Sequence, residues 1–167
     1  MLHITISSSG VISWPGHQCR CALGQGGLVA EASKREGDGA TPMGTYCLRR
    51  VLYRADRLSA PETQLPLRAM RQDDGWCDDP MDAAYNRPVR LPYPASAEAL
   101  WRTDHVYDLI GILSHNDAPP VPGLGSAIFM HLARPDFSPT RGCVALAEPD
   151  LRALLAWASP ATRLVVG

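Results

Sequence analysis

The chain has 167 residues, of which 46% are hydrophobic and 20% are charged, and its formal net charge is -1. This length allows one hydrophobic core, so we expect a single domain over residues 1–167. A near-neutral chain has no electrostatic basis for binding nucleic acid or an anionic membrane surface, and we expect neither as a partner. Fifteen prolines and fourteen glycines indicate many turns between short strands, which excludes a bundle of long helices.

The N-terminal residues Met1 to Ile6 alternate in hydrophobicity and predict a first β-strand. They lack the basic segment and apolar core of a secretory signal, so we expect a cytoplasmic location, or a periplasmic one if a signal was removed. Nowhere does the sequence approach the roughly 18 consecutive apolar residues of a membrane span. The five cysteines are then expected to be reduced. Cys19 and Cys21 lack a second cysteine pair, so we expect neither structural zinc nor any other cofactor.

Further along the chain, hydrophobic spacing predicts several more short elements. Strands are expected through the first fifty residues and over 45–53, 106–113, 126–131 and 162–166, with a helical turn at 96–101 and a helix from Pro149 that buries Leu151, Leu154 and Leu155. The stretch at about 54–94 is polar and rich in turn formers. So long a connection is usually functional, and we interpret it as an irregular insertion that covers the substrate.

The candidate nucleophile is Cys143, at the end of a polar turn that leads into an apolar segment. Gly142 permits a backbone conformation in which the N–H groups of Arg141, Gly142 and Cys143 converge on a developing oxyanion. A thiol needs a base, and His131 ends a predicted strand that a polar loop of eleven residues separates from Cys143. The alternative is a small buried cysteine and a hydrogen-bonded strand-end histidine, and the spacing alone does not decide between them.

Three segments occur in the order found in YkuD-type L,D-transpeptidases. They are Thr41-Pro42-Met43-Gly44, His131 at a strand end, and Thr140-Arg141-Gly142-Cys143. The chain therefore resembles this family over about residues 28–155. It departs from the usual pattern where Arg141 replaces a histidine, Ala145 replaces an arginine and Leu132 replaces a glycine. These departures indicate a divergent branch whose substrate contacts come from other positions.

The resemblance implies a mainly β, β-sandwich-like catalytic domain with a few short helices. It also implies that Cys143 attacks the carbonyl at the L centre of meso-diaminopimelate in a peptidoglycan stem tetrapeptide, and that D-alanine leaves from a thioester intermediate. His131 would carry the proton, oriented by a backbone carbonyl. If water accepts the acyl group, the enzyme is an L,D-carboxypeptidase of muropeptide recycling; an amine acceptor gives a 3–3 cross-link. The N-terminus and the replaced residues favour water.

Substrate carboxylates need cationic partners, and we expect His115, Arg134 and Arg141 to provide them. The alternative for each is an ordinary solvated residue without a binding role, and His115 is the strongest candidate of the three. Lys34, Asp38 and Thr41 are expected to shape a surface loop. A non-catalytic peptidoglycan-binding module and a thiol protease of another family remain as alternatives, although the protease leaves the Thr41 to Gly44 segment unexplained. The sequence makes no prediction of oligomeric state.

Overall fold

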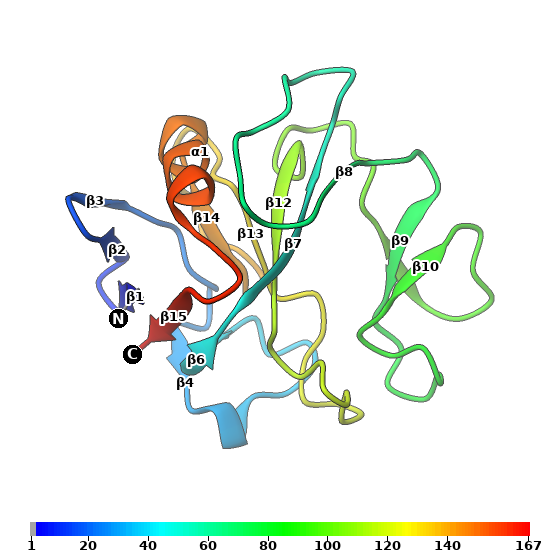
Figure 1. The fold of residues 1–167 in the computed structure, drawn as a ribbon. Helices are drawn as coiled ribbons and strands as arrows, with labels where there is room; N and C mark the ends of the chain where they lie inside the picture. Colours follow the sequence, from blue (N-terminus) through cyan, green and yellow to red (C-terminus); the bar gives the residue numbers. More distant parts are fainter. Residues whose placement is uncertain (1–2) are drawn as a thin grey trace.

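Short strands dominate residues 3–167, the part of the chain that the computed structural model describes (Figure 1). The predicted N-terminal alternation produces an antiparallel meander of β1 (His3–Ser7), β2 (Val11–Trp14) and β3 (His17–Arg20). Met1 and Leu2, which the first predicted strand included, lie outside the described residues. The last strand, β15 (Arg163–Val166), pairs in parallel with β1, so the two ends of the chain lie side by side. This first sheet has the order β3-β2-β1-β15-β6, where β6 is Gly44–Tyr46.

A second five-stranded sheet has the order β14-β13-β12-β7-β8. Its strands are β7 (Leu48–Tyr53), β8 (Leu67–Ala69), β12 (Leu109–Leu113), β13 (Phe129–Leu132) and β14 (Val144–Leu146). The predicted strand over 45–53 divides at Cys47, whose N–H donates to the Ser114 hydroxyl (2.8 Å). Its first part is β6 (Gly44–Tyr46), which joins the first sheet, so this segment passes from one sheet to the other.

Both faces of the second sheet are buried, and its side chains alternate between two apolar clusters. Val51, Met130 and Val144 belong to the main core, which also draws on the first sheet and on the helix. Their neighbours along the strands, Leu52, Phe129 and Cys143, belong to the second cluster. This alternation places Cys143 on the face that looks away from the main core.

The helix α1 (Glu148–Trp157) follows β14 directly and buries Leu151, Leu154 and Leu155, which confirms the predicted helix and its apolar face. Pro149 lies in its first turn, where a missing backbone N–H costs nothing. Among the described residues, no helix is long and apolar enough to cross a membrane. The mainly β architecture expected from the sequence is confirmed.

The stretch at 54–94 is more ordered than expected. It contains β8, β9 (Asp74–Cys77) and β10 (Pro88–Arg90), and β9 and β10 form a three-stranded sheet with β11 (Ala97–Ala99). Figure 1 shows β9 and β10 on the side of the second sheet opposite the N-terminal strands. The helical turn predicted at 96–101 is wrong, because pairing with β9 holds Ala97–Ala99 extended. The remaining elements are β4 (Leu28–Val29), the 3-10 turn η1 (Glu31–Ser33) and β5 (Thr41–Pro42).

Candidate active site

Two adjacent parallel strands bring the predicted nucleophile and base to one face of the second sheet. His131 on β13 lies level with Ala145 on β14, so Phe129 lies level with Cys143, immediately before β14. Residues two apart on a strand share a face, and those level with each other across the pair do as well. Cys143 and His131 therefore point to the same side, where both line a cavity of about 880 Å³.

The thiol of Cys143 is held by backbone groups of the strand entering β13. Its Sγ donates to the Ala127 carbonyl (3.2 Å) and accepts from the Phe129 N–H (3.4 Å). Ala127 has a φ of +54°, uncommon for a residue with a side chain, and its N–H donates to the Asn86 side-chain oxygen (3.1 Å). Burial raises the pKa of Cys143 to about 12, so the resting thiol is protonated at neutral pH.

His131 is oriented by a main-chain carbonyl. Its Nδ1 lies 3.0 Å from the Leu132 carbonyl oxygen, an arrangement in which Nδ1 carries the proton and Nε2 is the basic nitrogen. Burial lowers the pKa of His131 to about 4, so the imidazole is neutral at pH 7 and able to accept a proton. The Tyr107 ring packs edge-on against it, with centroids 5.2 Å apart.

The turn before Cys143 depends on a glycine and a threonine. Gly142 has a φ of +136°, and a Cβ there would lie 2.9 Å from the Ala40 carbonyl oxygen. The Thr140 hydroxyl donates to the Cys143 carbonyl (2.7 Å) and accepts from the Gly142 N–H (3.1 Å). The Gly142 N–H is therefore engaged by Thr140, whereas the sequence-based interpretation assigned it to the oxyanion.

The Thr41 to Gly44 segment supports this turn from the other side. The Thr41 hydroxyl accepts a hydrogen bond from the Gly24 N–H (2.9 Å) within the interior of the protein. Gly24 in turn packs so closely on the turn that an added Cβ would lie 3.0 Å from the Gly142 Cα. Thr41 is buried rather than part of a surface loop, and its hydroxyl holds the backbone that packs behind Gly142.

Charged side chains of both signs line the cavity. The cations are Lys34, Arg102, Arg134 and Arg141, and the anions are Glu36, Asp78 and Glu98. Arg102 and Arg134 share Asp104, and Lys34 pairs with Asp38. Arg141, two residues before the thiol, is exposed and has no hydrogen-bond or ion-pair partner among residues 3–167. Arg141 and Cys143 line the same cavity, so a guanidinium without a partner among residues 3–167 is available there.

A family model for the L,D-transpeptidase catalytic domain (YkuD) matches residues 5–166, nearly the whole chain. The chain belongs to this family. Enzymes of the family act on peptidoglycan stem peptides. No curated protein matches the sequence.

Two solved structures are similar to this L,D-transpeptidase domain. One is an L,D-transpeptidase from Mycobacterium smegmatis, with 11% identity and a TM-score of 0.44, and the other is L,D-transpeptidase 1 from Mycobacterium tuberculosis, with 12% identity and a TM-score of 0.39. Each alignment covers 99% of this chain but only 58% and 60% of the respective relative. The chain thus spans less than two thirds of either protein.

The L,D-transpeptidase domain gathers four of the residues singled out from the sequence, Cys143, His131, Arg134 and Arg141, around the one cavity. His115 is absent from its lining. Its Nε2 donates to the Leu124 carbonyl (2.9 Å) and its buried ring lies edge-on to Tyr46, so these contacts engage the imidazole away from the cavity. Of the stretch at 54–94, Asp78 alone lines the cavity.

Several cavity residues escaped sequence reasoning, among them Lys34, Glu98, Arg102 and Tyr107. Tyr107 donates its hydroxyl proton to Glu98, and burial raises the pKa of that carboxyl. Lys34 was assigned to a surface loop, yet its side chain is only 3% exposed. No motif marks these residues. In the sequence, a charged residue among turn formers looks the same whether its side chain is buried or solvated. Only its neighbours in the folded structure show which of the two it is.

Proposed function

We propose that this domain is a cysteine-dependent L,D-carboxypeptidase that removes the terminal D-alanine from peptidoglycan tetrapeptide stems. Cys143 is the nucleophile and His131 the base. The observation that carries the proposal is Arg141, whose guanidinium has no partner among residues 3–167 and which lines the same cavity of about 880 Å³ as Cys143. A volume of this order suits one peptide ligand.

The reaction proceeds through a thioester. As the substrate carbonyl approaches, the Cys143 thiol turns from the Ala127 carbonyl, Sγ attacks the carbonyl carbon, and the thiol proton passes to Nε2 of His131. The backbone N–H groups of Arg141 and Cys143 stabilise the oxyanion. When the C–N bond breaks, His131 protonates the amine of the departing D-alanine. Water then attacks the thioester, His131 accepts its proton, and this proton returns to sulfur as the C–S bond breaks.

An enzyme that removes one terminal residue has to recognise a free carboxylate next to the scissile bond. Arginine is suited to this task because its planar guanidinium donates two parallel hydrogen bonds to a carboxylate. Arg102 and Arg134 already share Asp104, which leaves Arg141 as the guanidinium available for the D-alanine carboxylate. The replacement of the usual histidine by Arg141 is thus assigned to product-side recognition.

The cavity also has anionic side chains that can bind a positive charge on the rest of the stem peptide. Diaminopimelate carries a free ammonium at its distal end, and Asp78 and Glu98 line the cavity as anions that can receive it. Arg102, whose guanidinium lies 5.3 Å from the Tyr107 ring centroid, places positive charge near the catalytic face. We assign to it the cationic role that an arginine at the Ala145 position has elsewhere in the family.

A direct test uses purified protein and a disaccharide tetrapeptide or free tetrapeptide, with D-alanine and the tripeptide measured by mass spectrometry. Turnover should be lost in Cys143→Ala. Unchanged turnover in this variant would refute the assignment of Cys143 as the nucleophile. Arg141→Gln should lower kcat/KM by at least about tenfold, the loss of a charge-assisted hydrogen bond worth roughly 1.5–3 kcal/mol. Arg163→Gln on distant β15 is the matched control and should retain full turnover. If Arg141→Gln is also fully active, the carboxylate is bound elsewhere.

The second candidate is transpeptidation, which the family's own activity favours. Adding a second stem or a D-amino acid as acceptor decides between the two. Tripeptide should dominate at all acceptor concentrations if water is the acceptor, whereas a 3–3 dimer as the main product would replace the proposal. The cytoplasmic location required for muropeptide recycling is part of the same proposal, and fractionation of producing cells tests it.

A further inference from the structure

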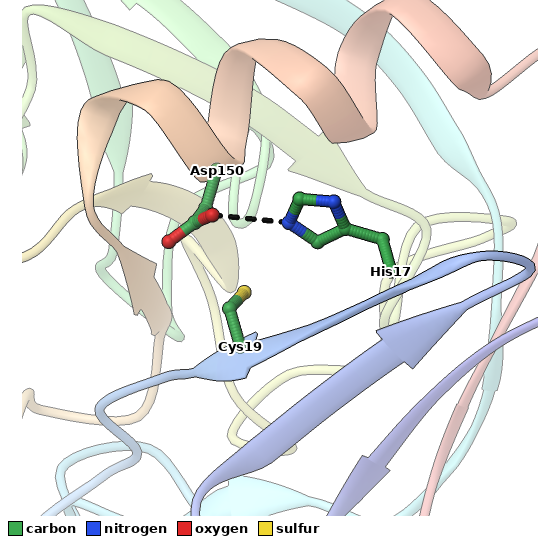
Figure 2. A group of neighbouring side chains, drawn as sticks. All are labelled: His17, Cys19 and Asp150. Atoms are coloured by element: carbon green, nitrogen blue, oxygen red, sulfur yellow. Dashed lines mark hydrogen bonds and ion pairs between the residues drawn. The ribbon is translucent and has the colours of Figure 1, made fainter.

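A second group of reactive side chains lies outside the cavity of Cys143, where β3 meets the start of α1 (Figure 2). His17 and Cys19 project from the same face of β3 because they are two residues apart on a strand. Asp150 reaches them from the first turn of α1. The ligand atoms of the three side chains all lie within 4.8 Å of one another. Segments distant in sequence thus converge on one point.

The three donors are those that zinc prefers: an imidazole nitrogen, a cysteine sulfur and a carboxylate oxygen. With bonds of about 2.0–2.3 Å, ligand atoms around a tetrahedral ion are roughly 3.2–3.7 Å apart. His17 Nε2 and Asp150 Oδ1, at 3.1 Å, already have nearly that separation. The remaining pairs lie within 4.8 Å, so they need to close by no more than about 1.6 Å, a movement that side-chain rotation of Cys19 can supply.

The surroundings of the group favour a cation. His17 is the ion-pair partner of Asp150, and among residues 3–167 no lysine or arginine pairs with this carboxylate. The side chains of His17 and Asp150 are 36% and 29% exposed, so an ion can enter from solvent. Trp14 stacks on the His17 ring at 4.2 Å and 13°, which fixes the direction in which its nitrogen points. A metal ligand benefits from such an outer-shell constraint.

We propose that His17, Cys19 and Asp150 bind one Zn²⁺ ion, with water as the fourth ligand. No local pattern indicates this site, because its third ligand, Asp150, lies 131 residues beyond Cys19 in the chain. The ion joins β3, the edge strand of the first sheet, to the helix that follows the nucleophile strand. The unfolded chain has no such preformed site, so binding stabilises the fold.

The test uses the full chain, kept reduced and stripped with a chelator, then titrated with Zn²⁺ against a chromophoric competitor. We expect one ion per chain at this site. Co²⁺ in place of Zn²⁺ should give a thiolate-to-metal charge-transfer band. Cys19→Ser should abolish the band, and His17→Gln or Asp150→Asn should weaken binding at least about tenfold. Cys47→Ser, a half-buried cysteine outside the group, is the matched control and should bind as the unchanged chain does.

The variant Cys143→Ala shows whether the metal binds at the Cys143 cavity instead. This variant should still bind one ion per chain and still show the Co²⁺ charge-transfer band. If the band survives in Cys19→Ser and disappears in Cys143→Ala, or if no ion binds at all, the proposal is overturned. Thermal melting adds an independent measurement. At free Zn²⁺ of one hundred times Kd, the unfolding equilibrium constant should fall about hundredfold. Cys19→Ser, folded by circular dichroism, should show no such shift; an equal shift would contradict the site.

Discussion

Because the imidazole of His131 is buried and neutral, we predict that the free energy of unfolding depends on pH through this residue. Its pKa lies near 4, whereas an exposed histidine titrates near 6.5. Between these values the unfolded chain binds a proton that the folded chain does not. The contribution of His131 to stability is therefore fully present above about pH 6.5 and is lost as the pH falls toward 4. The gap between the two pKa values corresponds to roughly 3 kcal/mol.

This contribution is isolated by comparing three proteins in urea at about pH 7.5 and about pH 4.5. Cys143→Ala retains His131 and should lose as much unfolding free energy between the two pH values as the unchanged chain. His131→Gln cannot titrate, and its loss should be smaller by about 2–3 kcal/mol. The carboxylates titrate alike in all three proteins, so their contribution cancels when the losses of unfolding free energy are compared. Equal losses in the three proteins would refute the assignment of a buried, neutral His131.

Three further substitutions test how the backbone around Cys143 is held in place. Gly142→Ala places a Cβ 2.9 Å from the Ala40 carbonyl oxygen at a φ of +136°, so we expect about 1–3 kcal/mol of destabilisation and a fall in kcat, measured by urea unfolding and D-alanine release. Thr41→Val removes the acceptor of the buried Gly24 N–H and should cost about 1–3 kcal/mol; a smaller cost would mean that another group replaces the hydroxyl. Asn86→Leu unpairs the Ala127 N–H and should reduce turnover even where circular dichroism shows a folded protein.

Local features of the chain determined several of its secondary-structure elements and the tight turn before Cys143. The alternation of Ile4 and Ile6 requires a strand with one buried face, and the leucines after Pro149 require an amphipathic helix. The Gly142-Cys143 step, with Thr140 before it, indicates a tight turn that presents a thiol. These inferences succeed because each depends on residues within a few positions of one another.

Tertiary structure decided what surrounds the thiol. Lys34, Glu98 and Tyr107 reach the cavity from separate loops and strands, and no spacing in the sequence indicates that they lie close together. The helical turn expected at 96–101 became β11 because pairing with β9 outweighed local propensity. His115 turned inward for the same reason that Asp150 came to lie beside His17: contacts across the fold, absent from any local pattern, fix which way a side chain faces.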